Sequence, residues 1–246
     1  MRFRASEVAA AVGGELVGDD VTLDGATQDS RAVTPGCLFV PVGAGRDGNE
    51  VIAAALAAGA AGYLTECEPG PGTAIRVEDT GAALLALGAA ARGSLSGPVV
   101  GITGSVGKTS VKDLTRAVLA RRGPVHASHR SFNNEIGVPL TLLGAPGDGP
   151  VIVELGARHV GDIAALCEVA RPDIGVLTTV AVAHTGEFGS VEAVARTKGE
   201  LFDAVPPDGC AVLNADVPAV VAQASRARSR VLTFGDVGEV RARDVV

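Results

Sequence analysis

The hydrophobic pattern changes along this chain, and its second part is the more regular. From residue 98 onward, short runs that are apolar at nearly every position alternate with longer segments whose apolar residues recur every three or four positions. Runs of the first kind are typical of strands buried on both faces, and segments of the second kind are typical of helices. We therefore predict an α/β fold with a doubly wound, mostly parallel sheet. The expected strands are residues 98–103, 150–157, 172–180, 209–216 and 230–235, and the expected helices are residues 110–123, 162–170, 190–205 and a segment near 218–227.

The first part of the chain shows the same alternation with shorter elements. Ser6 can cap a helix that ends at Gly13, and Asp79 or Thr80 can cap a helix that runs to residue 93. Strands that alternate with helices indicate a second, smaller α/β unit. The other elements expected here are strands at 37–42, 61–66 and 73–78 and a helix at 51–59.

A linker separates the two patterns. Residues 94–98 read Ser-Leu-Ser-Gly-Pro, a composition typical of loops. A length of 246 residues is compatible with two domains. We therefore predict a small domain over residues 1–93 and a larger one over residues 98–246.

Composition and charge exclude several classes of protein. Hydrophobic residues make up 47% of the chain and charged residues 20%, which favours a packed globular core. A formal net charge of −7 and an aromatic content of 3% argue against a nucleic-acid partner. Glu7 and Gly13 interrupt the N-terminal region where a signal peptide needs an apolar run, and the longest apolar run, 51–64, is too short to span a bilayer. We therefore predict a cytoplasmic protein without membrane insertion.

A glycine-rich stretch at 101–114, GITGSVGKTSVKDL, predicts a nucleotide site. It ends in Gly-Lys-Thr like a phosphate-binding loop, although Ile102 stands where the usual pattern has its first glycine. It lies between an expected strand and an expected helix, where backbone amides and the helix N-terminus attract phosphate. Lys108 would reach the β- and γ-phosphates, and the hydroxyl of Thr109 would bind Mg²⁺. The predicted nucleotide-binding residues of this loop are Gly104, Ser105, Val106, Gly107, Lys108, Thr109 and Ser110.

The lysines are few enough to be informative. Only Lys108, Lys112 and Lys198 occur among 21 basic residues, and the other 18 are arginines. A lysine in such a chain can mark a position where a compact charge or a reactive amine is required. Lys112 lies one helical turn beyond Lys108, so a phosphate contact and a solvated position both remain open. Lys198 taken alone is a solvated helical lysine.

Two strand ends carry further candidate side chains. Glu154 closes one expected strand and His184 follows the next one along the chain. Ligands of open α/β sheets sit at the carboxyl ends of the strands, so both side chains could reach a metal bound to a nucleotide. A surface or internally satisfied position is the alternative for each of them.

Six motifs in order resemble one family. They are GITGSVGKTSVKDL, SFNNEIGVPLTLL, VELGARHVGDIA, AHTGEFGS, TKGELF and AVLNAD, and the N-terminal stretch DSRAVTPGCLFVPVGAGRDGNE adds a seventh. Together they are similar to the Mur ligases, ATP-dependent enzymes of peptidoglycan precursor synthesis. The Asn-Asn-Glu-Ile-Gly-Val-Pro run fits best the member that joins D-alanyl-D-alanine to UDP-N-acetylmuramoyl-tripeptide through an acyl phosphate. The resemblance covers nearly the whole chain.

The resemblance implies a role for individual residues. Glu154 and His184 would hold magnesium, with two Mg²⁺ ions expected. Lys198 would react with CO₂ to give a carbamate that supports the second ion, a reaction that needs a neutral amine and that an arginine cannot perform. Asn214 and Asp216 would lie toward the adenosine of ATP. The substrate-binding residues implied are Ser30, Arg31, Arg46, Asp47, Gly48, Asn49, Asn133 and Asn134.

The resemblance also implies a domain layout. The domain at 1–93 would bind the UDP-sugar, and the domain at 98–246 would be the central ATP-binding domain, incomplete at its C-terminus. The family's C-terminal ligase domain would be absent, so we expect this chain alone to turn over poorly. We also expect a monomer. Two alternatives remain: a non-catalytic module that binds ATP or a UDP-sugar, and the sibling ligase that adds the diamino acid.

Overall fold

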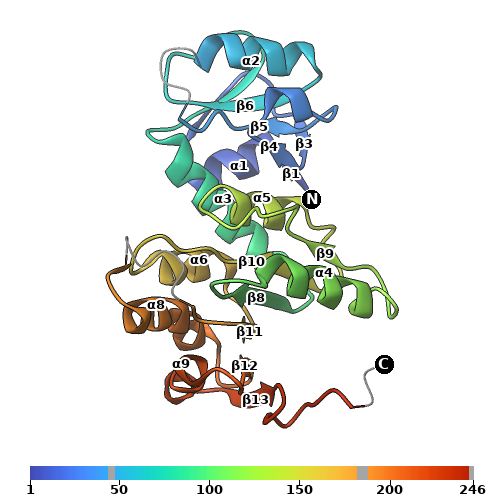
Figure 1. Cartoon of the computed structure of the whole chain (residues 1–246). Helices are drawn as coiled ribbons and strands as arrows, with labels where there is room; N and C mark the ends of the chain where they lie inside the picture. The colour runs from blue at the N-terminus through green and yellow to red at the C-terminus, as the bar shows by residue number, and fades with distance from the viewer. Residues whose placement is uncertain (44–47, 182–187, 244–246) are drawn as a thin grey trace. The chain divides into compact units, whose positions relative to one another are not determined.

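The computed structural model describes residues 1–43, 48–181 and 188–243 (Figure 1). They fall into two compact units, the first made of Met1–Ser94 with Leu142–Pro146 and the second of Leu95–Thr141 with Gly147–Val246. Three predicted site residues, Arg46, Asp47 and His184, lie outside the described residues.

The first unit is built around a five-stranded sheet. Four of its strands run parallel, and β2 pairs antiparallel with β7 at one edge. A two-stranded antiparallel ribbon of β1 and β3 accompanies it. In spatial order the sheet consists of β2 (Glu15–Val17), β7 (Thr73–Arg76), β6 (Gly62–Thr65), β5 (Leu38–Phe39) and β4 (Ala26–Thr27). The ribbon consists of β1 (Arg2–Arg4) and β3 (Thr22–Asp24). The helices are α1 (Ala5–Val12), α2 (Gly48–Ala57), α3 (Thr80–Gly93) and the 3₁₀ helix η1 (Ser30–Ala32).

Helix starts in this unit give one confirmed and one wrong prediction. Asp79 caps α3, because its carboxylate accepts the amide proton of Ala82 at 2.9 Å. Ser6 does not cap α1, which already begins at Ala5, and its hydroxyl instead lies 3.0 Å from Asp20. The N-cap residue is Arg4, and its amide donates to the carboxylate of Glu7 in the first turn at 2.7 Å.

The second unit contains a six-stranded sheet in which every pairing is parallel. Its first strand in the chain, β8, lies in the interior of the sheet between β11 and β10. In spatial order the sheet consists of β13 (Arg230–Phe234), β12 (Cys210–Asn214), β11 (Ile174–Leu177), β8 (Val99–Thr103), β10 (Val151–Glu154) and β9 (His126–Ala127). The helices are α4 (Lys108–Leu119), α6 (Asp162–Ala170), α8 (Val191–Ala204), α9 (Pro218–Val221) and the 3₁₀ helix η3 (Ala224–Arg226), and the second unit also contains the beginning of α5 (Gly137–Gly144), whose last residues from Leu142 belong to the first unit.

Helices cover both faces of this sheet, as the apolar strands predict. Val100 and Ile102 of β8 pack in one cluster with Val111 and Leu119 of α4. Gly101, which points to the opposite face, has Leu201 of α8 so close that an added Cβ would lie 3.2 Å from it. Figure 1 shows α4 on one side of the strands and α6 and α8 on the other. The prediction of a doubly wound parallel sheet is confirmed.

Several helix bounds differ from the expected ones: α2 spans Gly48–Ala57 instead of 51–59, and α4 ends at Leu119 instead of residue 123. Helix α4 begins at Lys108, two residues before the expected start, because Gly107 in the left-handed region at φ 84° ends the preceding loop. The helix expected near 218–227 is split into α9 and η3. Among the described residues, no helix combines the length and hydrophobicity that a bilayer crossing would require.

Candidate nucleotide-binding site

The glycine-rich loop lies at the carboxyl end of β8, where β10 and β11 end on either side of it. The chain leaves β8 toward β9 and β10 on one side and later continues to β11 on the other. Such a reversal of strand order opens a crevice at the carboxyl edge of a doubly wound sheet, which is the usual ligand position. The topology therefore places Gly104–Lys108 where a ligand is expected.

Gly104 is required by its backbone and by its surroundings. Its φ is 152°, and an added Cβ would overlap the hydroxyl of Thr178 and crowd the backbone of Thr179. A larger residue could not bring the loop this close to β11. Glycine at this position therefore sets the distance between the loop and the neighbouring strand end.

The loop is fastened to the residues that follow β11. The amide of Ser105 donates to the carbonyl of Thr179 at 2.9 Å, and the amide of Val106 donates to the Thr179 hydroxyl at 3.2 Å. The hydroxyl of Thr178 lies 2.8 Å from the carbonyl of Val106, and the amide of Ala181 donates to the Ser105 hydroxyl at 3.0 Å. These contacts hold the loop against the residues that follow β11.

The amides available to an anion are those of the first turn of α4. The first hydrogen bond of the helix runs from the amide of Val111 to the carbonyl of Gly107 at 2.9 Å. The amides before Val111 therefore have no intrahelical acceptor. They also lie at the positive end of the helix dipole. Because the amides of Ser105 and Val106 are occupied by Thr179, phosphate is expected at Gly107–Ser110 rather than deeper in the loop.

The side chain of Lys108 lies over the loop. Its Nζ donates to the carbonyl of Gly104 at 2.8 Å, and the side chain is half-buried. Burial lowers the pKa of Lys108, and the negative charge of Glu154 opposes that change. A phosphate in the loop could replace the carbonyl of Gly104 as the acceptor.

Glu154 links three parts of the site. One carboxylate oxygen, Oε2, lies 2.9 Å from the hydroxyl of Thr109, and the other, Oε1, accepts from the side-chain amide of Asn133 at 2.9 Å. Its own amide donates to the hydroxyl of Ser128 at 3.1 Å. Only 1% of Glu154 is exposed. The carboxylate predicted from its place at a strand end therefore lies beside Thr109, as the metal hypothesis requires.

Lys198 is buried on α8, with 5% of its surface exposed. Burial, and to a smaller extent the positive charge of Lys108, lowers the pKa of Lys198 from 10.5 to about 8. A solvated position, which the residue taken alone suggested, is therefore wrong. An amine with this pKa is partly neutral near physiological pH.

Glu200 fixes α8 against α6. Its carboxylate accepts the amide protons of Gly161 and Ala164, both at 3.0 Å, and so caps the N-terminus of α6 from outside. The turn that precedes α6 is held by Asp162, whose carboxylate accepts the amide protons of Arg158 and His159 at 2.7 and 2.8 Å. The helix that carries Lys198 is thereby tied to the segment that follows Glu154.

Comparison with known proteins identifies the family of this arrangement. A family model described as the Mur ligase middle domain matches residues 102–245. The chain belongs to the Mur ligase family. The resemblance inferred from the six motifs is confirmed.

Relatives of known sequence agree with this assignment. A Mycobacterium tuberculosis protein named UDP-N-acetylmuramoyl-tripeptide–D-alanyl-D-alanine ligase is 47% identical over 229 residues, which cover 83% of this chain and 45% of the relative. The Escherichia coli protein of the same name is 41% identical over 214 residues, 86% of this chain and 47% of the relative. The chain thus spans about half the length of the Mur ligases it matches.

Solved structures agree on the fold. A crystal structure of MurF from Acinetobacter baumannii matches all of this chain and 56% of its own, with a TM-score of 0.89 and 26% identity. A MurF ligase from Thermotoga maritima in complex with ADP matches 87% of this chain and 51% of its own, with a TM-score of 0.75 and 32% identity. The α/β fold class predicted for this Mur ligase chain is confirmed.

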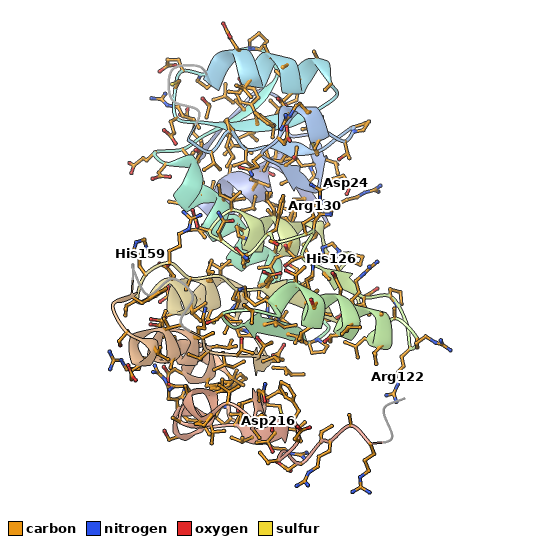
Figure 2. The ribbon with its side chains drawn as sticks, viewed as in Figure 1. Asp24, Arg122, His126, Arg130, His159 and Asp216 are labelled. Carbon is orange, nitrogen blue, oxygen red and sulfur yellow. The ribbon has the colours of Figure 1, made fainter. Side chains whose placement is uncertain are left out.

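The structure gives local roles to the other predicted residues of the Mur ligase domain. Asn134 accepts the amide proton of Gly137 at 3.0 Å and so caps α5. Asn214 ends β12 and accepts the amide proton of Asp216 at 3.0 Å. Asp216, labelled in Figure 2, accepts the amide protons of Asp236 and Val237 after β13. The adenosine role implied for Asn214 and Asp216 stays a prediction.

The predicted UDP-sugar residues that can be described lie in the first unit. Ser30 and Arg31 form η1 after β4, at the carboxyl edge of the parallel part of that sheet. The guanidinium of Arg31 donates twice to Asp29, with both distances 2.9 Å, and this contact lowers the pKa of Asp29 to about 2. Gly48 and Asn49 are the first residues of α2.

Sequence reasoning missed the residues that hold the Mur ligase site together. Thr178 and Thr179 shape the loop, Ser128 orients Glu154, and Glu200 positions α8. The Thr-Thr pair had a readable signal, because it ends a strand expected to lie in the same parallel sheet as the loop. The contacts of Ser128 and Glu200 depend on tertiary packing, which no local sequence pattern predicts. Within the described residues, no three His, Cys, Asp or Glu side chains converge on one point.

The depressed pKa of Lys198 predicts a pH-dependent stability difference. Between pH 8 and 10.5 the unfolded chain binds a proton at Lys198 that the folded chain has lost, so burial of this amine costs less as pH rises. Lys198→Met should therefore raise the free energy of unfolding at pH 7 by about 2–3 kcal/mol, and that gain should shrink toward pH 10. Urea unfolding at pH 7 and pH 9.5 in CO₂-free buffer measures it.

The control for this measurement is Arg196→Met, because Arg196 is an exposed charge on the same helix. Its effect should be small and equal at both pH values. A gain for Lys198→Met that is the same at pH 7 and pH 9.5 would show that the amine is charged in the folded protein throughout this range.

Proposed function

We propose that this chain is the substrate- and ATP-binding part of a ligase that adds D-alanyl-D-alanine to UDP-N-acetylmuramoyl-tripeptide. The relatives that are 47% and 41% identical carry the name of that activity. The observation that carries the proposal is local: Lys108, Thr109 and Glu154 lie together at the open first turn of α4. The first unit would hold the UDP-sugar and the second unit MgATP.

The loop supports ATP as the phosphate donor. Four amides at a helix N-terminus, a lysine whose amine bonds to the loop carbonyl and a threonine hydroxyl beside a carboxylate are the groups that bind a nucleoside triphosphate. The relative from Thermotoga maritima, described in complex with ADP, is 32% identical to this chain. We place the β- and γ-phosphates at Gly107–Ser110.

The residues present fit a magnesium ion bound with ATP. Thr109 Oγ1 and Glu154 Oε2, 2.9 Å apart, are oxygen ligands of the kind that Mg²⁺ prefers, and Mg²⁺ commonly takes one or two carboxylates together with phosphate oxygens. When bound, the ion would neutralise charge on the phosphates. His184, the further ligand implied by the resemblance, lies outside the described residues.

Lys198 fits the carbamate that the resemblance implies. A neutral amine forms a carbamate when its nitrogen lone pair attacks the carbon of CO₂, with loss of one proton from the nitrogen. Burial and Lys108 lower the pKa of Lys198 to about 8, which supplies that neutral amine near physiological pH. The carbamate would carry a negative charge and would support a second magnesium ion.

The reaction proposed for the full-length enzyme activates a carboxylate. The terminal carboxylate of the tripeptide would attack the γ-phosphorus of ATP, giving an acyl phosphate and ADP, and the amine of D-alanyl-D-alanine would then displace phosphate. Both reactants of the first step are anions, so the site must offset their repulsion. Lys108 and the amides of Gly107–Ser110 are fixed positive groups at the required place.

Calorimetry and a ligation assay test this proposal. The chain should bind MgATP with micromolar affinity in a titration, and it should bind UDP-N-acetylmuramoyl-tripeptide independently. Phosphate release with ATP, tripeptide substrate and D-alanyl-D-alanine should be slow for this chain alone. Absence of MgATP binding would contradict the proposal, and binding of both ligands without ligation by any longer form would favour a non-catalytic module.

Substrate choice is tested by the acceptor amine. A diamino acid accepted in place of D-alanyl-D-alanine, with UDP-N-acetylmuramoyl-dipeptide as the donor, would identify the sibling ligase instead. The monomeric state and the cytoplasmic location inferred from the sequence stay predictions.

A further inference from the structure

Lys112 is the most deeply buried lysine of the chain, with 2% of its surface exposed. Its Nζ donates to the carbonyls of Ser128 and Arg130, both at 2.9 Å, and lies 3.2 Å from the carboxylate of Asp113. A phosphate contact and a solvated position were both open from the sequence. The structure gives neither, because the amine is committed to the protein.

The chemistry of the site explains why a lysine stands here. An ammonium group has three N–H donors around one nitrogen, and Lys112 has three acceptors around its nitrogen. A guanidinium spreads five donors over a plane and cannot direct three of them from one nitrogen. A chain that otherwise has 18 arginines therefore keeps a lysine at residue 112.

The two carbonyls belong to a strained turn. Arg130, labelled in Figure 2, lies in the loop between β9 and α5 and has a φ of 49°. A residue other than glycine in this region costs of order 1 kcal/mol or more and persists only where its surroundings hold it. The ammonium of Lys112 donates hydrogen bonds to both ends of this turn, at the carbonyls of Ser128 and Arg130.

The segment from Ser128 to Asn133, which begins with this turn, supplies two groups that contact Glu154. The hydroxyl of Ser128 accepts the amide proton of Glu154, and the side-chain amide of Asn133 donates to Glu154 Oε1. The carbonyl of Asn133 also accepts the amide proton of Gly156 at 2.7 Å. The segment held by Lys112 therefore orients the carboxylate that lies beside Thr109.

We propose that Lys112 is a positioning residue for Glu154. Through the turn at residues 128–130 it fixes the segment that aims the carboxylate of Glu154 at the hydroxyl of Thr109. The proposal rests on the proposed function, in which these two oxygens bind Mg²⁺ together with ATP. Lys112 itself touches neither the nucleotide nor the metal. One helix, α4, thus carries the phosphate lysine, the metal-binding hydroxyl and the residue that orients the partner carboxylate.

The test compares ATP affinity with and without Mg²⁺ in the wild type and in Lys112→Met. Methionine keeps the length of the side chain and removes the three donors. Affinity for ATP in EDTA should stay within about twofold of the wild type, because Lys108 and the loop amides are untouched. The gain in affinity on adding Mg²⁺ should fall by about tenfold, as is typical when a group that orients a metal ligand is lost.

Hydrogen exchange gives a second readout that needs no ligand. In Lys112→Met the amides of Glu154 and Gly156 should exchange at least tenfold faster, since their acceptors lie on the released segment. The amides that join β11 to β12 should exchange at wild-type rates. Faster exchange throughout the sheet would instead indicate a merely structural role and would overturn the proposal.

Further variants keep the proposal falsifiable. Ser128→Ala leaves the backbone acceptors of Lys112 in place and removes the acceptor of the Glu154 amide proton, so it should reproduce part of the loss of the Mg²⁺ gain. Lys112→Arg should fail to restore that gain, and Arg121→Met, an exposed charge just beyond α4, should leave it unchanged. A Lys112→Met protein with wild-type Mg²⁺ gain and wild-type exchange overturns the inference. A wild-type protein that binds no ATP overturns the proposed function, and the exchange data still decide the role of Lys112.

Discussion

Replacing Lys108 by alanine is expected to weaken ATP binding by about 100-fold, equivalent to about 2.7 kcal/mol. The amine lies over the loop and can exchange its bond with the carbonyl of Gly104 for a bond with phosphate. A charge-assisted hydrogen bond in a partly desolvated site is about twice as strong as a neutral one. Titration calorimetry or displacement of a fluorescent ATP analogue measures the change in affinity.

The fold should tolerate this substitution. Burial lowers the pKa of Lys108, so loss of its charge removes a desolvation cost that offsets the lost hydrogen bond. Urea unfolding of Lys108→Ala should therefore differ little from the wild type. Arg121→Ala is the matched control, because it removes an exposed positive charge just after the same helix. An affinity for Lys108→Ala within threefold of the wild type would contradict the assignment of this loop to ATP.

Gly104→Ala is expected to lower the free energy of unfolding by about 4 kcal/mol and to abolish ATP binding. Part of the cost is the backbone, since φ is 152°, a region that costs other residues about 1–3 kcal/mol. The rest is steric, because the new Cβ would overlap the hydroxyl of Thr178 and would push the loop away from β11.

Gly123→Ala separates the two contributions. Gly123 has a φ of 158°, close to that of Gly104, but an added Cβ meets no atom within 4 Å. This variant should lose only the backbone part, about 1–2 kcal/mol, and should bind ATP like the wild type. Thermal or urea unfolding together with the ATP titration checks both variants. Equal losses of stability for the two alanines would mean that contact with Thr178 does not determine the loop.

Five of the six strands of the sheet in the second unit could be predicted because each carries its own signal, whereas the two-residue strand β9 was not predicted. β8, β10 and β11 are apolar at nearly every position, and burial on both faces produces that pattern directly. The ribbon strands β1 and β3 were not predicted, because three residues are too few to show an alternation. The cap at Ser6 was wrong for a related reason: several polar side chains near a helix start can serve, and the tertiary partner Asp20 decides among them.

Part of the site could be predicted because its residues stand at the ends of predicted elements. Lys108, Thr109 and Glu154 stand at strand or helix ends, so sequence position and topology together bring them to one edge of the sheet. Lys112 could not be interpreted, because its partners Ser128 and Arg130 are 16 and 18 positions away and act through their backbone carbonyls. A carbonyl belongs to every residue type, so no sequence pattern reveals which one a buried cation will use.

The hydrogen bonds that join the loop to Thr178 and Thr179 have a consequence for how the chain folds. All residues of the glycine-rich motif lie between positions 101 and 114. The hydrogen bonds that fix its shape, however, join it to residues 72 to 76 positions further along the chain. Contacts between residues so distant along a chain form late in folding, because the entropy of closing the intervening stretch must be overcome first. A nascent chain that has been synthesised only as far as α4 therefore contains the complete loop sequence but cannot yet bind a nucleotide. The loop becomes able to bind when β11 packs against β8.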